Sequence, residues 1–226
     1  MNERYSTNQR SKKVLMICMG VLTLFIGTLV SVSAQRPEIS QEIDAKVEKF
    51  LYENRGKWHD WNVPYQDGQL LYNLIVKHHY KRALEIGTST GHSSIWIAWA
   101  LSKTGGELIT IEIDKGRYKI ALENFKKAGV ERFIDARLAN AHQLVRELEG
   151  PFDFVFSDAD KEWYSQYFKD VGPKLLKDGC FTAHNVNDAN GGVKEFLDYV
   201  RKLPNYQTSI EGSSRSGVSI SYKMSD

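Results

Sequence analysis

Cysteine is scarce in this chain, whose 226 residues include only Cys18 and Cys180. Cys18 lies in an apolar N-terminal segment, so a mature chain that has lost this segment keeps one cysteine. A single cysteine forms no internal disulfide and builds no cysteine-rich metal site. The scarcity therefore excludes a disulfide-stabilised scaffold and a cysteine-based zinc protein.

The chain also lacks a large excess of positive or negative charge. The formal net charge is +2, from 30 Lys and Arg against 28 Asp and Glu. Residues 1–34 hold four of the basic and one of the acidic residues, which leaves 26 and 27 in the remainder, a net charge of −1. Nucleic-acid-binding domains typically carry a strong basic field. We therefore expect no nucleic acid as a partner.

The N-terminal segment is the one long apolar run of the sequence. It reads RSKKVLMICMGVLTLFIGTLVSVSAQ, with a basic start, about 17 uncharged residues and small residues before Gln35. This pattern is typical of a secretory signal, so we expect cleavage after Ala34 and export of residues 35–226 as one domain. The alternative is an uncleaved membrane anchor over residues 14–30, which would be the only attachment to a membrane.

The remainder alternates strand and helix patterns and contains no internal repeat or low-complexity tract. Short apolar runs predict strands over 82–87, 107–113, 132–138, 152–158, 179–186, 206–210 and 217–223. Helical spacing of apolar residues predicts helices over 40–55, 68–80, 93–103, 116–129, 141–148, 160–175 and 192–203. This alternation predicts an α/β fold, a mostly parallel seven-stranded sheet with helices on both faces. The last two strands have no helix between them and predict an antiparallel C-terminal edge.

Polar side chains stand at the ends of the predicted strands. They are Glu85 and Gly87, Glu112 and Asp114, Asn140, Asp158 and Asp160, and His184 and Asn185. In a doubly wound sheet, ligands bind beyond the carboxyl ends of the strands, near the point where the strand order reverses. A binding site is therefore expected at this edge.

The segment LEIGTSTGHSS predicts a strand, a glycine turn and the start of a helix. Gly87 and Gly91 allow a tight turn and a close approach by a ligand, and Glu112 ends the next strand, where it can bind a ribose diol. A dinucleotide fingerprint needs a second glycine where this chain has Ser89, which disfavours a nicotinamide oxidoreductase. The Glu85 carboxylate suits a cationic, amino-acid-bearing ligand such as S-adenosylmethionine. A plain strand–turn–helix junction is the alternative.

The segment FDFVFSDADKEWY ends a predicted strand in Asp158, followed by Asp160 and Lys161. Carboxylates bind divalent cations, and a lysine beside such a cation can accept a proton from a substrate hydroxyl. The alternative is an acidic helix N-terminus that favours the helix dipole. The segment FTAHNV similarly ends in His184 and Asn185, which are either metal ligands or structural residues at a strand end.

Together these motifs resemble the cation-dependent O-methyltransferases, the family of the catechol and caffeoyl-coenzyme A O-methyltransferases. The resemblance covers about residues 55–225 and rests on the segments WNVPYQDGQLL, LEIGTSTGHSS, IEID, FDFVFSDADKEWY and LLKDGCFTAHNV. It implies a Rossmann-like class I methyltransferase fold and transfer of a methyl group to a small, aromatic or catechol-like hydroxylated acceptor.

The resemblance also implies the site residues. S-adenosylmethionine would be held by Asn62, Val63, Glu85, Gly87, Ser93, Glu112, Ala141, His142 and Asp158. Lys161 would be the general base, with Asp158 as a second catalytic residue, and Asp158 and Asn185 would bind the metal. We expect His184, at the strand end beside Asn185, to be a third metal ligand. The family usually has an aspartate where this chain has His184, so we expect the metal preference to shift from Mg²⁺ toward Mn²⁺, Fe²⁺, Co²⁺ or Zn²⁺.

The sequence is also compatible with three alternatives. One is an exported protein of the same fold that binds S-adenosylmethionine or another small ligand without catalysis. Another is a methyltransferase that works without metal. The sequence is also compatible with a homodimer.

Overall fold

The protein is described here by a computed structural model that covers residues 40–212 and 214–226. The predicted leader and its cleavage site lie outside these residues. The chain divides into two units, Met1–Glu42 and Ile43–Asp226, and the fold below is that of the second unit. Among the described residues, no helix is long and apolar enough to cross a membrane.

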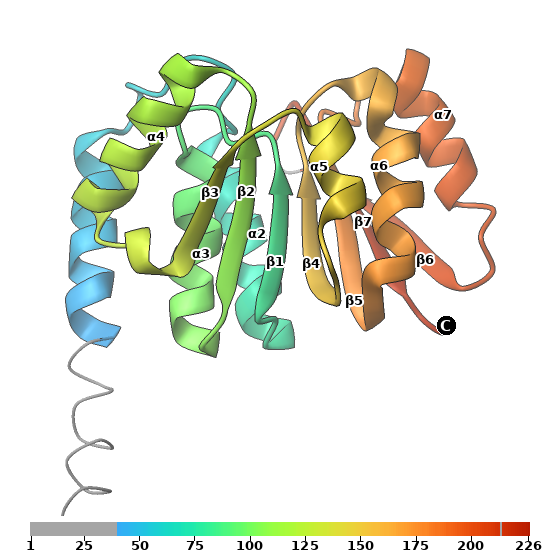
Figure 1. Cartoon of the computed structure of the whole chain (residues 1–226), viewed down its shortest axis with the longest axis horizontal. Helices are drawn as coiled ribbons and strands as arrows, with labels where there is room; N and C mark the ends of the chain where they lie inside the picture. Colours follow the sequence, from blue (N-terminus) through green and yellow to red (C-terminus); the bar gives the residue numbers. More distant parts are fainter. Residues whose placement is uncertain (1–39, 213) are drawn as a thin grey trace, which may run out of the picture. The chain divides into compact units, whose positions relative to one another are not determined.

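Within the described residues the second unit is built on a seven-stranded sheet (Figure 1). Its strands are β1 (Arg82–Ile86), β2 (Glu107–Glu112), β3 (Ile134–Leu138), β4 (Phe152–Ser157), β5 (Leu175–His184), β6 (Tyr206–Glu211) and β7 (Val218–Lys223). The strand order is β3-β2-β1-β4-β5-β7-β6. Strands β1 to β5 are parallel, and β7 pairs antiparallel with both β5 and β6. The predicted α/β fold with an antiparallel C-terminal edge is confirmed.

Helices connect the parallel strands. They are α2 (Tyr65–His78), α3 (His92–Thr104), α4 (Lys115–Ala128), α5 (Ala141–Glu147), α6 (Tyr164–Val171) and α7 (Gly191–Val200). Short 3₁₀ turns cover η1 (Glu131–Phe133), η2 (Lys161–Trp163) and η3 (Gly172–Lys174). A further helix runs through residues 43–53. The helix predicted over 160–175 is thus one α-helix with a 3₁₀ turn at each end.

The two faces of the sheet bury different sets of helices. One core cluster joins β1, β4 and β5 to α5, α6 and α7, and Figure 1 shows α5 and α6 in front of β4 and β5. A second cluster joins the opposite face to α2 and α3, and a third packs α4 and the helix over 43–53 against α3. Helix α7 illustrates the pattern: its buried residues Val193, Phe196, Leu197 and Val200 recur at helical spacing on one side.

Strand β5 is longer than its sequence predicts. It begins at Leu175 instead of Gly179, and its pairing with β4 shifts register before Cys180. Asp178 has a φ of 64° at this irregularity. Lys177, Asp178 and Gly179 look like a turn in the sequence, but here they form a bulge inside the strand. Cys180 follows the bulge as a buried free thiol.

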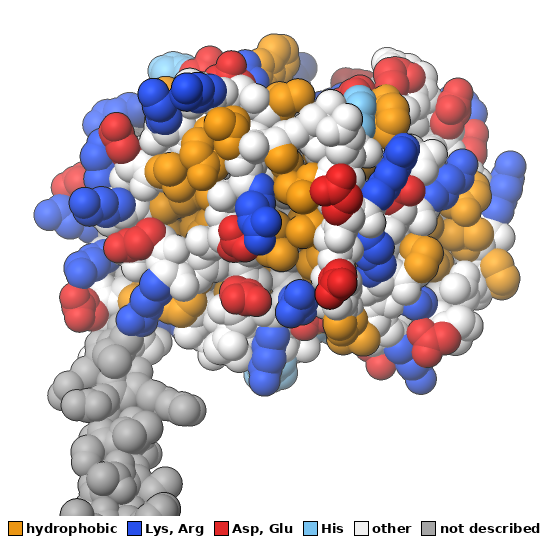
Figure 2. Space-filling model, in the orientation of Figure 1, with side chains coloured by type: hydrophobic (Ala, Val, Ile, Leu, Met, Phe, Trp, Pro, Cys, Tyr) orange, Lys and Arg blue, Asp and Glu red, His pale blue; other side chains and the backbone are white. Residues whose placement is uncertain are grey.

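The surface is mixed in charge on the face that Figure 2 shows, where Lys and Arg side chains are interspersed with Asp and Glu.

The strand order reverses between β1 and β4, so the loops that follow these two strands diverge to opposite faces of the sheet. Such a reversal opens a crevice at the carboxyl ends of the strands.

Candidate active site

A cavity of about 580 Å³ opens at the carboxyl ends of β1 to β5. Its volume lies within the usual range of small-molecule sites. Nine of the predicted site residues line it: Asn62, Gly87, Glu112, Ala141, His142, Asp158, Lys161, His184 and Asn185. Val63, Glu85 and Ser93 are buried but do not line it. The topology therefore brings most of the predicted residues, far apart in sequence, to one place.

The turn after β1 brings the backbone of β1 close to that of β4. Gly87 has a φ of 103°, and a Cβ at this position would lie 2.9 Å from the Asp158 carbonyl oxygen. The Asp158 N–H donates to the Ile86 carbonyl oxygen at 2.9 Å. Both the left-handed backbone and the close approach require glycine. The cavity floor is thus a backbone surface without side chains at this point.

Glu112 ends β2 with a carboxylate that the backbone fixes in place. Its Oε2 accepts the Ser89 N–H at 2.7 Å, and its Oε1 accepts the N–H groups of Ile113 at 3.1 Å and Asp114 at 2.9 Å. A carboxylate has about four acceptor positions, so one stays available for a ligand hydroxyl. The arrangement suits the ribose contact that the sequence predicts.

Glu85 lies behind this surface and is fully buried. Its Oε2 accepts hydrogen bonds from the hydroxyls of Ser94 and Thr110, while its Oε1 has no partner. Burial raises the pKa of Glu85 to about 7, although the hydroxyl hydrogen bonds oppose this shift. Glu85 does not line the cavity, and its predicted contact with the cofactor stays a prediction.

The segment before α2 is tied to the glycine turn. Asn62 Nδ2 donates to the Thr90 hydroxyl at 2.7 Å, and its Oδ1 accepts the His92 N–H at 3.2 Å. Trp61, next to it, has a φ of 66°, is 82% exposed and lines the cavity. Asn62 thus holds an aromatic side chain at the mouth of the cavity.

His92 opens α3 as a buried, neutral imidazole. Its Nδ1 contacts the Val63 carbonyl oxygen at 2.8 Å and its Nε2 contacts Trp96 Nε1–H at 3.1 Å, so Nδ1 carries the proton and Nε2 accepts. Burial lowers the pKa of His92 to about 4, against the opposing hydrogen bond to Val63. The predicted contact of Val63 with the cofactor stays a prediction.

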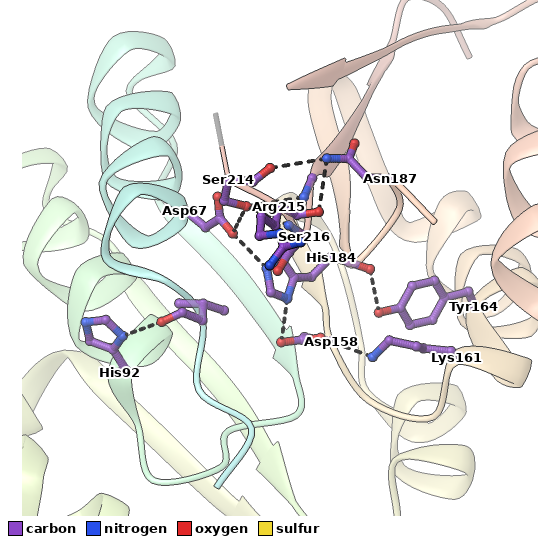
Figure 3. Close-up of polar contacts among 12 residues, drawn as sticks. Asp67, His92, Asp158, Lys161, Tyr164, His184, Asn187, Ser214, Arg215 and Ser216 are labelled. Carbon is purple, nitrogen blue, oxygen red and sulfur yellow. Dashed lines mark hydrogen bonds and ion pairs between the residues drawn. The ribbon is translucent and has the colours of Figure 1, made fainter. Parts of the chain in front are cut away.

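His184 lies between two buried carboxylates at the end of β5 (Figure 3). Its Nδ1 is 3.0 Å from Asp158 Oδ2 and its Nε2 is 2.8 Å from Asp67 Oδ2. Burial by itself lowers the pKa of His184, but the hydrogen bonds and charges of Asp158 and Asp67 outweigh it and raise this pKa to about 9. The ring is therefore an imidazolium that donates from both nitrogens at neutral pH.

Lys161 approaches the same cluster from η2. Its Nζ is 3.7 Å from Asp158 Oδ1, and its side chain is 44% exposed. Asp158 thus directs one oxygen to Lys161 and the other to His184 (Figure 3). The predicted pair of Asp158 and Lys161 is therefore in contact at the cavity.

His142 closes another side of the cavity, on the first turn of α5. Its ring stacks on Trp163 with centroids 3.5 Å apart, and its Nε2 is 2.9 Å from Asp160 Oδ2. Asn140 caps the helix by accepting the His142 N–H at 2.9 Å. These contacts fix the wall to which Ala141 and His142 belong.

Comparison with known proteins places this geometry in a family. The family described as O-methyltransferase matches residues 30–208. The chain belongs to the O-methyltransferase family. A catechol O-methyltransferase from Niastella koreensis is 40% identical over 112 residues, 48% of this chain and 50% of the relative. A caffeoyl-CoA O-methyltransferase from Populus kitakamiensis is 35% identical over 142 residues, 61% and 60% of the two chains.

A solved structure of similar fold is TomG, an O-methyltransferase from Streptomyces achromogenes involved in tomaymycin synthesis, in complex with S-adenosylmethionine. It is 25% identical, covers 80% of this chain and 90% of TomG, and has a TM-score of 0.68. The alignments with the two sequence relatives span about half and three fifths of those proteins. The resemblance of the sequence to this O-methyltransferase family is thus confirmed.

The donor atoms of this family member do not fit a divalent cation as they are placed. Both nitrogens of the predicted ligand His184 already contact carboxylates, and within the described part of the chain Asn185 lines the cavity without a hydrogen bond to Asp67, Asp158 or His184. Among residues 40–212 and 214–226, no group of three or more His, Cys, Asp or Glu could hold a metal ion. The metal therefore stays a prediction without support from the geometry.

Two residues of the cluster are missing from the sequence prediction. Asp67 is fully buried on the first turn of α2, and the Ser214 hydroxyl donates to its Oδ2 at 2.7 Å. An acidic residue in a first helical turn ordinarily favours the helix dipole and carries no further signal. Asp67 is 117 positions from His184, so nothing local reveals their contact.

Proposed function

We propose that this chain is an S-adenosylmethionine-dependent O-methyltransferase that methylates a hydroxyl of a small, aromatic or catechol-like acceptor. The observation that carries the proposal is the cavity at the strand-order reversal, where the Gly87 backbone and the fixed Glu112 carboxylate face the same space. The names of the relatives, catechol and caffeoyl-CoA O-methyltransferases, support the choice of acceptor.

The cavity suits S-adenosylmethionine by its shape and its charge. Gly87 leaves room where any side chain would collide, and Glu112 keeps one acceptor position for a ribose hydroxyl. Ala141 and His142 would border the base, and Asp158, which lines the same cavity, would lie near the methionine part. TomG, a structure of the same fold, contains S-adenosylmethionine, which supports this assignment.

When bound, S-adenosylmethionine supplies an electrophilic methyl group on a sulfonium sulfur. The chain's contribution is to hold the acceptor hydroxyl in line with that methyl group and to limit water, which can supply most of the rate. Lys161 Nζ would take the proton that leaves the acceptor oxygen, and Asp158 Oδ1, 3.7 Å away, would stabilise the ammonium that results. The acceptor oxygen gains the methyl group, and the carbon–sulfur electron pair stays with sulfur.

The test is transfer of labelled methyl groups from S-adenosylmethionine to a panel of catechols and related phenols. The exchange Lys161→Ala should lower kcat by roughly a hundredfold or more, the usual contribution of a general base. Lys177→Ala is the matched control, because Lys177 is an exposed lysine near the opposite end of β5. Turnover of the wild type no greater than that of Lys161→Ala would refute the role of Lys161.

The same assay separates the proposal from a non-catalytic binding protein of the same fold. Calorimetric binding of S-adenosylmethionine without methyl transfer to any acceptor of the panel would favour the binding protein. Transfer to at least one acceptor would favour the enzyme.

A further inference from the structure

Two buried carboxylates face one another across the His184 ring. The side chains of Asp67 and Asp158 are 0% and 9% exposed, and that of His184 is 4% exposed. Buried carboxylates are strongly destabilising unless a cation or several hydrogen-bond donors accompany them. The structure supplies this partner from within the chain, because both ring nitrogens lie within 3.0 Å of a carboxylate oxygen.

A divalent cation at this place would need the atoms that His184 already engages. Oδ2 of Asp158 and Oδ2 of Asp67 both accept from the ring, and Oδ1 of Asp158 lies 3.7 Å from Lys161 Nζ. Lone pairs that accept hydrogen bonds are not free to coordinate, and the His184 ring itself fills the space between the two carboxylates. Within the described residues, Oδ1 of Asp67 is the one oxygen of these two carboxylates that has no partner, whereas hard cations such as Mg²⁺ take several oxygen ligands.

We propose that the His184 side chain takes the place of the divalent cation in this chain, and that methyl transfer proceeds without a metal. The inference rests on the proposed function and changes its mechanism: the group that joins Asp158 to Asp67 is a side chain of the protein. His184 is a positioning residue here, because both of its ring nitrogens contact carboxylates.

The cluster also reaches the loop between β6 and β7. The Ser214 hydroxyl donates to Asp67 Oδ2 at 2.7 Å and accepts the N–H groups of Ser216 and Gly217. Ser216 lines the cavity, and Figure 3 shows it beside His184. His184 therefore connects the Asp158 side of the cavity with the loop on its other side, through Asp67.

The experiment compares the wild type with His184→Asp, using Mn²⁺ as the probe. Electron paramagnetic resonance counts the bound Mn²⁺ ions. Calorimetry in the presence of EDTA measures S-adenosylmethionine binding, and methyl transfer is assayed in the presence of either EDTA or Mn²⁺. The wild type should bind no stoichiometric Mn²⁺ and should lose no activity in EDTA. The exchange His184→Asp replaces the imidazole ring by a third carboxylate, so this variant should bind one Mn²⁺ ion. Its activity should fall at least about tenfold when EDTA removes that ion.

The control His79→Asp places the same exchange at an exposed histidine after α2, and it should bind no Mn²⁺. One equivalent of Mn²⁺ on the wild type, with activity lost in EDTA, would overturn the inference. A folded His184→Asp that takes up no Mn²⁺ would contradict it as well. If His184→Asp fails to fold, the Mn²⁺ titration of the wild type decides. Absence of S-adenosylmethionine binding would instead refute the proposed function, and the Mn²⁺ titration would still stand.

Discussion

Two buried histidines in this site carry different charges because their partners differ. His92 contacts a carbonyl oxygen and an indole N–H, so one nitrogen donates, the other accepts, and the ring is neutral. His184 contacts two carboxylates, so both nitrogens donate and the ring is positive. Burial is nearly the same at the two positions, 2% and 3% exposed. The chemistry of the partners, more than burial, therefore sets the charge of each ring.

The neutral state of His92 predicts a pH dependence of stability. Its pKa is about 4 in the folded chain and about 6.5 when unfolded, so the unfolded chain binds more protons between these values. The free energy of unfolding should therefore fall as the pH drops from about 6.5 to about 4, by up to roughly 3 kcal/mol from this group. Urea unfolding at a series of pH values measures the slope.

The exchange His92→Gln should remove this contribution and flatten the curve in the same pH window. His79→Asn is the control, since His79 is exposed and its left-handed backbone tolerates asparagine. An unchanged slope in His92→Gln would show that His92 is not a neutral buried ring.

At the scale of elements, the turn from β1 to α3 is the least tolerant part of the site. Gly87→Ala introduces a Cβ at 2.9 Å from the Asp158 carbonyl oxygen and a left-handed alanine. The strain should lower the free energy of unfolding by about 1–3 kcal/mol and weaken S-adenosylmethionine binding. Urea unfolding and calorimetry measure the two effects. Gly105→Ala is the control, because its φ of 74° is also positive but no atom lies within 4 Å of the added Cβ. Equal losses in both variants would mean that the close approach to β4 does not matter.

Asn62 joins the segment that carries Trp61 to this same turn. Asn62→Ala removes the hydrogen bonds to Thr90 and His92, so the mouth of the cavity should loosen. We expect the Kd for S-adenosylmethionine to rise by about tenfold, in line with the loss of one to two hydrogen bonds. Calorimetry on Asn54→Ala, whose side chain donates to a backbone carbonyl of the helix over 43–53, provides the comparison. Equal Kd values for Asn62→Ala and Asn54→Ala would show that Asn62 does not contribute to S-adenosylmethionine binding.

The sequence predicts elements well where the pattern is local. All seven strands appear, because apolar runs bounded by turn residues are local signals. The start of β5 escapes prediction, since a bulge at Asp178 has the composition of a turn. The strand ends also predict most residues around the cavity, because parallel strands bring their carboxyl ends together.

The partners of those residues are less predictable. His184 as a metal ligand follows from resemblance and residue type, whereas its actual contacts depend on Asp67 and on the loop that holds Ser214. Asp67 comes from a helix that carries no strand-end signal. Which atoms meet across 117 residues is decided by packing between α2 and β5, and a single sequence does not encode that locally.

At the scale of the whole molecule, the predicted leader determines where the enzyme would act. We propose that residues 1–34 direct export and are removed after Ala34. The purified mature protein should then begin at Gln35, and mass spectrometry of the intact chain measures this. A chain that keeps residues 14–30 and partitions with membranes would favour the anchor instead. Export would also require a source of S-adenosylmethionine outside the cytoplasm.

Calorimetric titration with S-adenosylmethionine measures whether the cavity at the strand ends binds this cofactor. The wild type should bind one equivalent, and Glu112→Ala should weaken binding by roughly 10- to 100-fold, the value of hydrogen bonds to a charged group. Glu107→Ala, an exposed change at the other end of β2, should bind like the wild type. No binding by the wild type, or binding by Glu112→Ala as tight as that of the wild type, would contradict the assignment of this cavity as the S-adenosylmethionine site.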